Sequence, residues 1–137
     1  MVSCYFALSM DVADSDDADY RISQMEMGLD GLVALTESKA SRSYTYHSIH
    51  CRRGDDVALM NGVPVCVSDT EDKAVIGSLK LIEDIEDKES CVIFKGKDKT
   101  AEDFRKLKNA IAAEYPFLEV SMIESEQTAY SWMVGVL

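Results

Sequence analysis

Capped helical stretches alternate with compact apolar strands over the second half of the chain, and this alternation constrains the fold more than any other feature. Residues 68–71 have the form of a capping box, and residues 100–103 open a second amphipathic stretch in the same way. Pro116 should end that second helix. The expected elements are a helix over residues 69–87, a strand over 90–96, a helix over 100–115 and a strand over 117–125. Because helices placed between strands require crossover connections, we expect an α/β (α+β) fold in which a mixed β-sheet has helices packed on it.

An Asn61-Gly62 pair separates two short apolar arms just upstream, in the stretch "DVALMNGVPVCV". A type I′ turn needs a positive φ angle at both central positions, and asparagine followed by glycine adopts it readily. The stretch therefore predicts a β-hairpin. Its second arm should be an edge strand, because Pro64 has no N–H to donate to a neighbouring strand. Residues 41–51 carry the aromatic and β-branched mixture that is typical of one further strand.

The N-terminal part of the chain predicts an amphipathic helix from about residue 15 to residue 38. The apolar residues that recur at helical spacing are Ile22, Met25, Leu29 and Leu32. We expect this stripe to face the core rather than to line a ligand groove. The complete order is then α-β-β-β-α-β-α-β-β in a single domain of residues 1–137, with 1–40 as an acidic leading helix and 41–137 as the α/β body.

Charge and hydropathy restrict the class of protein. Acidic residues outnumber basic ones 25 to 14, which gives a formal net charge of -11 and argues against nucleic-acid binding, since phosphate contacts need clustered lysine and arginine. No apolar run approaches the roughly 20 residues that a membrane helix needs, and the first ten residues lack the basic start of a signal peptide. We therefore expect a cytoplasmic protein without membrane insertion.

The cysteines and histidines do not form a recognisable metal or disulfide pattern. The four cysteines are far apart and each lies beside apolar residues, which favours free, buried thiols over disulfides. His47, His50 and Cys51 form the one cluster that resembles metal ligands. On a strand the two histidines would face opposite sides, and no second ligand pair completes a tetrahedral site. We expect no metal or other cofactor.

The motifs of common enzyme classes are missing from the sequence. It contains no GxxxxGK[ST], GxGxxG, GxSxG or HExxH stretch, so a kinase or dehydrogenase of familiar type lacks its phosphate-binding loop. We expect no catalytic residue in this chain and no enzymatic activity of the chain on its own.

The chain ends in the apolar stretch "SEQTAYSWMVGVL", which contains its single tryptophan. Tyr130 and Trp132 alternate with smaller residues, which predicts a strand with one aromatic face. Two interpretations stay open at this point. The aromatic face lies under a helix as ordinary core, or the strand joins the sheet and also shows its aromatic side chains to a partner.

The C-terminal stretch "VIFKGKDKTAEDFRKLKNAIAAEYPFLEVSMIESEQTAYSWMVGVL" resembles the C-terminal domain of the large subunit of bacterial fatty acid kinase, a dihydroxyacetone-kinase-like family. The last strand of that family usually reads close to Gly-Gln-Pro-Leu-Tyr-x-Tyr. Gln127, Tyr130 and Trp132 fall on its glutamine and aromatic positions, whereas Glu126 and Thr128 replace its glycine and proline. Upstream, the stretch "RRGDDVALMNGVPV" resembles the family's basic-Gly-Asp segment and the hairpin that follows it.

The resemblance implies a division of labour. In that family an N-terminal domain binds ATP and magnesium, a separate DegV-like subunit carries the fatty acid, and the C-terminal domain is associated with docking that subunit. The resemblance thus implies a non-catalytic domain that docks an acyl-carrying partner through Gln127, Tyr130 and Trp132. Lys95, Lys97 and Arg105 would steer an acidic partner. A homodimer is compatible with this interpretation.

Two alternatives remain at the level of sequence. The chain could be a stand-alone domain that binds a small molecule or an acyl chain, with the methionine-rich first helix and the hairpin lining a pocket. It could also be a small enzyme that uses His47 or a cysteine. An enclosed apolar cavity would favour the first alternative, and convergent polar groups in a cleft would favour the second.

Overall fold

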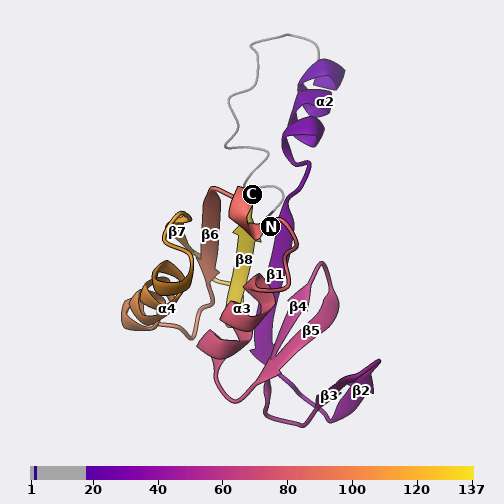
Figure 1. Ribbon diagram of the computed structural model, residues 1–137, viewed down its shortest axis with the longest axis vertical. Coiled ribbons are helices and arrows are strands. Elements are labelled where there is room, and N and C mark those ends of the chain that lie inside the picture. The colour runs from indigo at the N-terminus through magenta and orange to yellow at the C-terminus, as the bar shows by residue number, and fades with distance from the viewer. Residues whose placement is uncertain (1, 3–17) are drawn as a thin grey trace.

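The computed structural model describes Val2 and residues 18–137, which form a six-stranded sheet, a small two-stranded sheet and three α-helices (Figure 1). The strands are β1 (Val33–Lys39), β2 (Tyr44–Tyr46), β3 (Ile49–Cys51), β4 (Asp56–Met60), β5 (Val63–Ser68), β6 (Ser90–Lys95), β7 (Glu119–Glu124) and β8 (Trp132–Val136). The described helices are α2 (Ala18–Gly28), α3 (Glu71–Leu79), α4 (Ala101–Glu114) and the 3-10 turn η1 (Ile85–Asp87).

The large sheet is mixed and has the strand order β5-β4-β1-β8-β6-β7. Only β6 and β7 run parallel, and α4 provides the crossover between them; the other neighbours pair antiparallel. This arrangement confirms the predicted α+β class and the predicted order from the hairpin onward. The last strand, β8, lies in the middle of the sheet between β1 and β6.

Both α3 and α4 pack on the same face of the sheet and bury the main core. Helix α3 contributes Val75 and Leu79, and α4 contributes Leu107 and Ile111. The sheet residues of this core are Leu35, Cys91, Ile93, Trp132, Val134 and Val136. A second, smaller cluster lies on the opposite face and contains Val2, Val92 and Phe94.

The helix starts follow from local capping. Thr100 accepts a hydrogen bond from the Asp103 amide and the Asp103 carboxylate accepts one from the Thr100 amide, which confirms the predicted capping box. The cap of α3 is Thr70 rather than Ser68, and this helix ends at Leu79 instead of continuing to residue 87. The chain then tightens so that Ile82 reaches the core. Within the described part of the chain, no helix combines the length and the apolar character that crossing a membrane requires.

The hairpin prediction is confirmed. Asn61 has φ 50° and Gly62 has φ 85°, as a type I′ turn requires, and β5 is an edge strand that accommodates Pro64. The Asn61 side chain also accepts a hydrogen bond of 3.1 Å from the Ala34 amide, so the turn is fixed to β1.

The leading helix is shorter than predicted. Helix α2 ends at Gly28, and residues 33–39 form β1, a central strand of the sheet, so the expected boundary at residue 40 falls after that strand. Gly31 adopts φ 80°, a value that stops a helix. The expectation that the stripe faces the core is wrong for α2, which has no buried residue and stands apart from the sheet (Figure 1).

Residues 41–51 form a small hairpin, β2–β3, rather than the single predicted strand. The chain reverses after Tyr46, where His47 adopts φ 50°, and Tyr44 then pairs with Cys51. The described cysteines Cys51, Cys66 and Cys91 are free thiols, and burial raises the pKa of Cys91 to about 12, which keeps it unreactive. Cys4 lies outside the described residues.

The position of Trp132 gives the first testable prediction. Its side chain is 0% exposed at the centre of the main core, so Trp132→Ala should lower the free energy of unfolding by about 3–5 kcal/mol. Urea unfolding followed by circular dichroism measures this change without the tryptophan signal. Phe117→Ala is the matched control, since Phe117 is 46% exposed and should cost about 1 kcal/mol or less. Equal effects of the two substitutions would contradict the placement of Trp132 in the core.

Candidate functional site

A polar pocket of about 350 Å³ opens where β1 and β6 end and β8 begins. Four segments line this polar pocket: Ser38 and Lys39 at the end of β1, Glu71 at the start of α3, residues 97–99, and residues 127–131. Strands β1 and β6 end at the same edge of the sheet because β8 pairs antiparallel with both of them. The topology thus brings together segments that are distant in sequence.

Close backbone approach shapes one wall of the pocket. The Gly96 amide donates a hydrogen bond of 2.9 Å to the Ser131 carbonyl, and the Lys97 amide donates one of 3.0 Å to the Gln127 carbonyl. A Cβ atom on residue 96 would lie 2.5 Å from the carbonyl oxygen of Tyr130, so only glycine fits here. The loop 127–131 is therefore held tightly against the end of β6.

Gln127 fixes the conformation of that loop. Its Nε2 donates to the Tyr130 carbonyl at 2.7 Å, and its Oε1 accepts from the Tyr130 amide at 2.9 Å. One side chain thus satisfies both backbone groups of Tyr130, as a backbone turn would. Gln127 acts first as a structural clamp, and its neighbours form the accessible wall.

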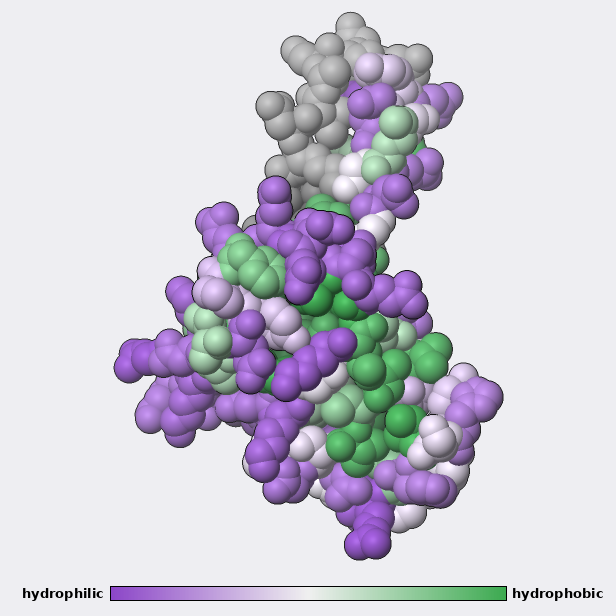
Figure 2. Space-filling view, viewed as in Figure 1, coloured by the Kyte–Doolittle hydropathy of each residue, from purple (hydrophilic) through white to green (hydrophobic). Residues whose placement is uncertain are grey.

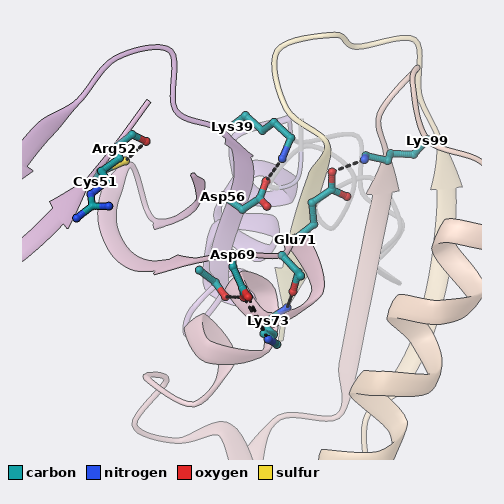
Figure 3. Close-up of polar contacts among 10 residues, drawn as sticks. Lys39, Cys51, Arg52, Asp56, Asp69, Glu71, Lys73 and Lys99 are labelled. Atoms are coloured by element: carbon teal, nitrogen blue, oxygen red, sulfur yellow. Dashed lines mark hydrogen bonds and ion pairs between the residues drawn. The ribbon is translucent and has the colours of Figure 1, made fainter. Parts of the chain in front are cut away.

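Two ion pairs flank the pocket (Figure 3). Lys39 Nζ lies 2.9 Å from Asp56 Oδ1, and Lys99 pairs with Glu71 at the N-terminus of α3. Beneath them, Lys95 Nζ donates to the Lys99 carbonyl at 2.7 Å, so this lysine supports the 97–99 segment. The charged groups of the pocket are thereby held in fixed positions.

A buried carboxyl group, Glu37, lies in β1 next to this arrangement. Its side chain is 1% exposed, and neither carboxyl oxygen has a hydrogen-bond partner among the described residues. Burial raises the pKa of Glu37 to about 8, and the negative charges of Glu71 and Asp56 contribute to this rise. Glu37 is therefore protonated at neutral pH.

Trp132 is the neighbour of Glu37 across the β1–β8 pairing, and its Nε1 also has no hydrogen-bond partner among the described residues. Sequence reasoning missed Glu37 because the helical pattern that begins near residue 15 extends over residues 33–38. The alternation of Val33, Leu35 and Glu37 along a strand is the signal that places this carboxyl group on the core face.

The structure brings together some of the residues predicted to bind a partner and separates others. Lys97, Gln127 and Tyr130 line the polar pocket. Lys95 lies beneath it, and Arg105 is exposed on α4 outside the pocket lining. Trp132 faces the helices and is fully buried, so it does not present an aromatic surface to a partner. The tail is core at Trp132 and accessible at the loop before it.

The apolar surface of the molecule lies elsewhere. Figure 2 shows a green patch over the β4–β5 hairpin and beside α3. The hairpin contributes Val63, which is 42% exposed, and the half-buried Met60 and Val65. This patch is aliphatic, whereas the sequence suggested an aromatic surface on the tail.

The histidines occupy ordinary structural positions. His47 lies in the β2–β3 turn against the Tyr46 ring, with 4.5 Å between the ring centroids. His50 lies in β3 with its Nδ1 3.1 Å from the Thr45 hydroxyl. Among Val2 and residues 18–137, no three histidine, cysteine or acidic side chains are grouped closely enough to hold a metal ion.

The raised pKa of Glu37 predicts a specific pH dependence of stability. Between its ordinary value of 4.5 and about 8, the folded protein retains a proton that the unfolded chain releases. The contribution of Glu37 is therefore fully present below pH 4.5 and is lost as the pH rises through 8. It should decrease by up to about 1.4 kcal/mol per pH unit in this window.

Glu37→Gln keeps the shape of the side chain and removes this dependence. The difference in unfolding free energy between wild type and variant, measured in urea at about pH 5, 6.5 and 8, should move steadily in favour of the variant. Glu119→Gln, at an exposed position of β7, is the control and should show no such trend. A constant difference for Glu37→Gln would show that the carboxyl group is already ionised in the folded state.

The comparisons with known proteins agree with this architecture. The profile of the FakA-like C-terminal family, which describes the C-terminal part of FakA-like components of fatty acid kinase, matches residues 1–136. The chain is also similar to the "Uncharacterized protein MG369 homolog" of Mycoplasma pneumoniae, with 29% identity over 118 residues that cover 84% of this chain and 21% of that protein. The chain thus spans about a fifth of the length of this relative. On the family match, the chain belongs to the FakA-like C-terminal family of fatty acid kinase proteins.

Proposed function

We propose that this chain is a non-catalytic docking domain of a fatty-acid-kinase-type protein, and that the face around the polar pocket engages a DegV-like subunit that carries the acyl chain. The observation that carries the proposal is the convergence of Lys97, Gln127 and Tyr130 on one pocket. Membership of the family supports the general role. The contact with a partner is the new step.

The pocket has the chemistry of a polar recognition surface. Lys97 is 59% exposed and lies 3.8 Å from Glu126, so its ammonium group is accessible to a partner carboxylate. Lys39 and the hydroxyl groups of the 127–131 loop lie beside it. The clamp of Gln127 keeps this loop in one conformation, which lowers the entropic cost of binding.

Binding of the acyl chain itself by this domain is less well supported. A long apolar tail needs continuous apolar walls. The groove between α3 and α4, about 530 Å³ in volume, contains Ile76 as its one large apolar side chain, beside Gly77, Ala110 and Ala113 and charged residues at its rim. We therefore place the acyl chain on the partner protein.

The kinase reaction itself belongs, in this proposal, to another part of a longer protein. The sequence has no phosphate-binding loop of a familiar kind, and phosphoryl transfer depends on such a loop and on bound magnesium. Purified chain incubated with labelled ATP, magnesium and the acyl-loaded partner should form no acyl phosphate. Formation of labelled acyl phosphate would overturn the non-catalytic assignment.

Charge reversal at the pocket tests the docking role. Lys97→Glu should weaken binding of the acyl-loaded partner by about tenfold, because a repulsive contact replaces an attractive one. The effect should diminish at high salt. Titration calorimetry measures both.

Lys108→Glu introduces the same charge change on α4 at an exposed position that does not line the polar pocket, and it should leave the affinity nearly unchanged. Circular dichroism confirms that both variants are folded. Equal affinities of the two variants would place the docking surface away from the polar pocket.

A further inference from the structure

A second, smaller pocket lies between the first turns of α3 and α4. This interhelix pocket has a volume of about 230 Å³ and is lined by Thr70, Glu71, Asp72, Asp103, Lys106 and Trp132. It shares Glu71 with the polar pocket. Three carboxylates and one ammonium group therefore surround a space large enough for one side chain.

The carboxylates of the interhelix pocket differ in how far they are already satisfied. Glu71 is paired with Lys99, and Asp103 accepts the Thr100 amide at 2.9 Å in the capping box. The Asp72 carboxylate makes no hydrogen bond or ion pair with the described residues. Burial raises the pKa of Asp72, and the charges of Glu71 and Asp103 raise it further. Negative charge is therefore in excess at Asp72.

The floor of the pocket gives an independent indication of a ligand. Trp132 lines the pocket and is fully buried, yet its Nε1 donor has no partner among the described residues. A buried N–H group without an acceptor is costly, so an incoming acceptor would be favoured here. The pocket thus favours a ligand with a positive group and a nearby acceptor.

Other occupants fit less well. An anion would be repelled by the three carboxylates. A metal ion would need several close ligands, and no such group of three occurs among the residues that the structure describes. The positive ends of the two helices do not repel a cation strongly, because Thr70 and Thr100 cap them and acidic side chains occupy both first turns.

We propose that the interhelix pocket binds an arginine side chain of the partner protein. The planar guanidinium group has five donors and can contact Asp72 and a second carboxylate together. A backbone carbonyl next to that arginine would accept a hydrogen bond from Trp132. The natural occupant rests on the docking proposed above, whereas the chemistry of the pocket does not.

A small probe tests the pocket without the partner. N-acetyl-arginine amide carries both the guanidinium and the carbonyl acceptor, and N-acetyl-citrulline amide is its uncharged counterpart. Trp132 is the only tryptophan, so its indole N–H gives a single resonance that reports on the floor of the pocket. Titration should shift this resonance in a saturable way with the arginine amide, and the citrulline amide should bind at least about tenfold more weakly. No shift, or an equal response to both amides, would overturn the proposal.

Removal of one charge separates the pocket from general attraction to an acidic protein. Asp72→Asn should weaken binding of the arginine amide by about fivefold, as expected for the loss of one partly buried ion pair. Asp69→Asn removes the same charge just before α3 but outside the interhelix pocket, and it should have little effect. Equal weakening by both substitutions would overturn the proposal, and melting curves verify that both variants are folded. Titration of the acyl-loaded partner with the same variants tests docking separately, so the two failures are distinguishable.

Discussion

The structure depends on the insertion of the last strand, β8, into the middle of the sheet. Strand β8 pairs with β1 on one side and with β6 on the other, and so joins the N-terminal strands to the C-terminal ones. Without it, β1, β4 and β5 would have no connection within the sheet to β6 and β7. Its inward residues Trp132, Val134 and Val136 are all buried in the main core. The apolar end of an otherwise acidic chain is explained by this central position.

The same strand determines where the two pockets lie. The loop that leads into β8 forms one wall of the polar pocket, and the first residue of β8, Trp132, forms the floor of the interhelix pocket. Glu71 lines both, and its ion pair with Lys99 couples their charges. The negative charge of Glu71 also raises the pKa of both Glu37 and Asp72. Occupation of one pocket by a charged group should therefore affect the other through Glu71.

Local signals in the sequence predict the elements that local physics determines. The Asn61-Gly62 turn and the capping box at Thr100 depend on a few neighbouring residues, and the structure confirms both. The single helix predicted from residue 15 to residue 38 is wrong because helical spacing at its start overlaps the strand alternation that begins at Val33. Nothing local distinguishes these two periods over so short a stretch.

The candidate site is only partly predictable for a related reason. Gln127, Tyr130 and Lys97 lie in segments next to strand ends, and the family resemblance points to the first two. The burial of Trp132 and the raised pKa of Glu37 depend on which strands become neighbours. Pairing between β1 and β8 joins segments about a hundred residues apart, so no stretch of sequence alone specifies it. These tertiary contacts convert an ordinary glutamate into a protonated buried group.

The central claim is that the accessible loops around β8, rather than its buried tryptophan, form the contact with a partner. Hydrogen–deuterium exchange of this chain, with and without the acyl-loaded partner, tests the claim most directly. The account predicts slower exchange at residues 96–99 and 127–131 in the complex, with little change in the β4–β5 hairpin. Protection confined to the β4–β5 hairpin, with the two pocket loops unchanged, would contradict it.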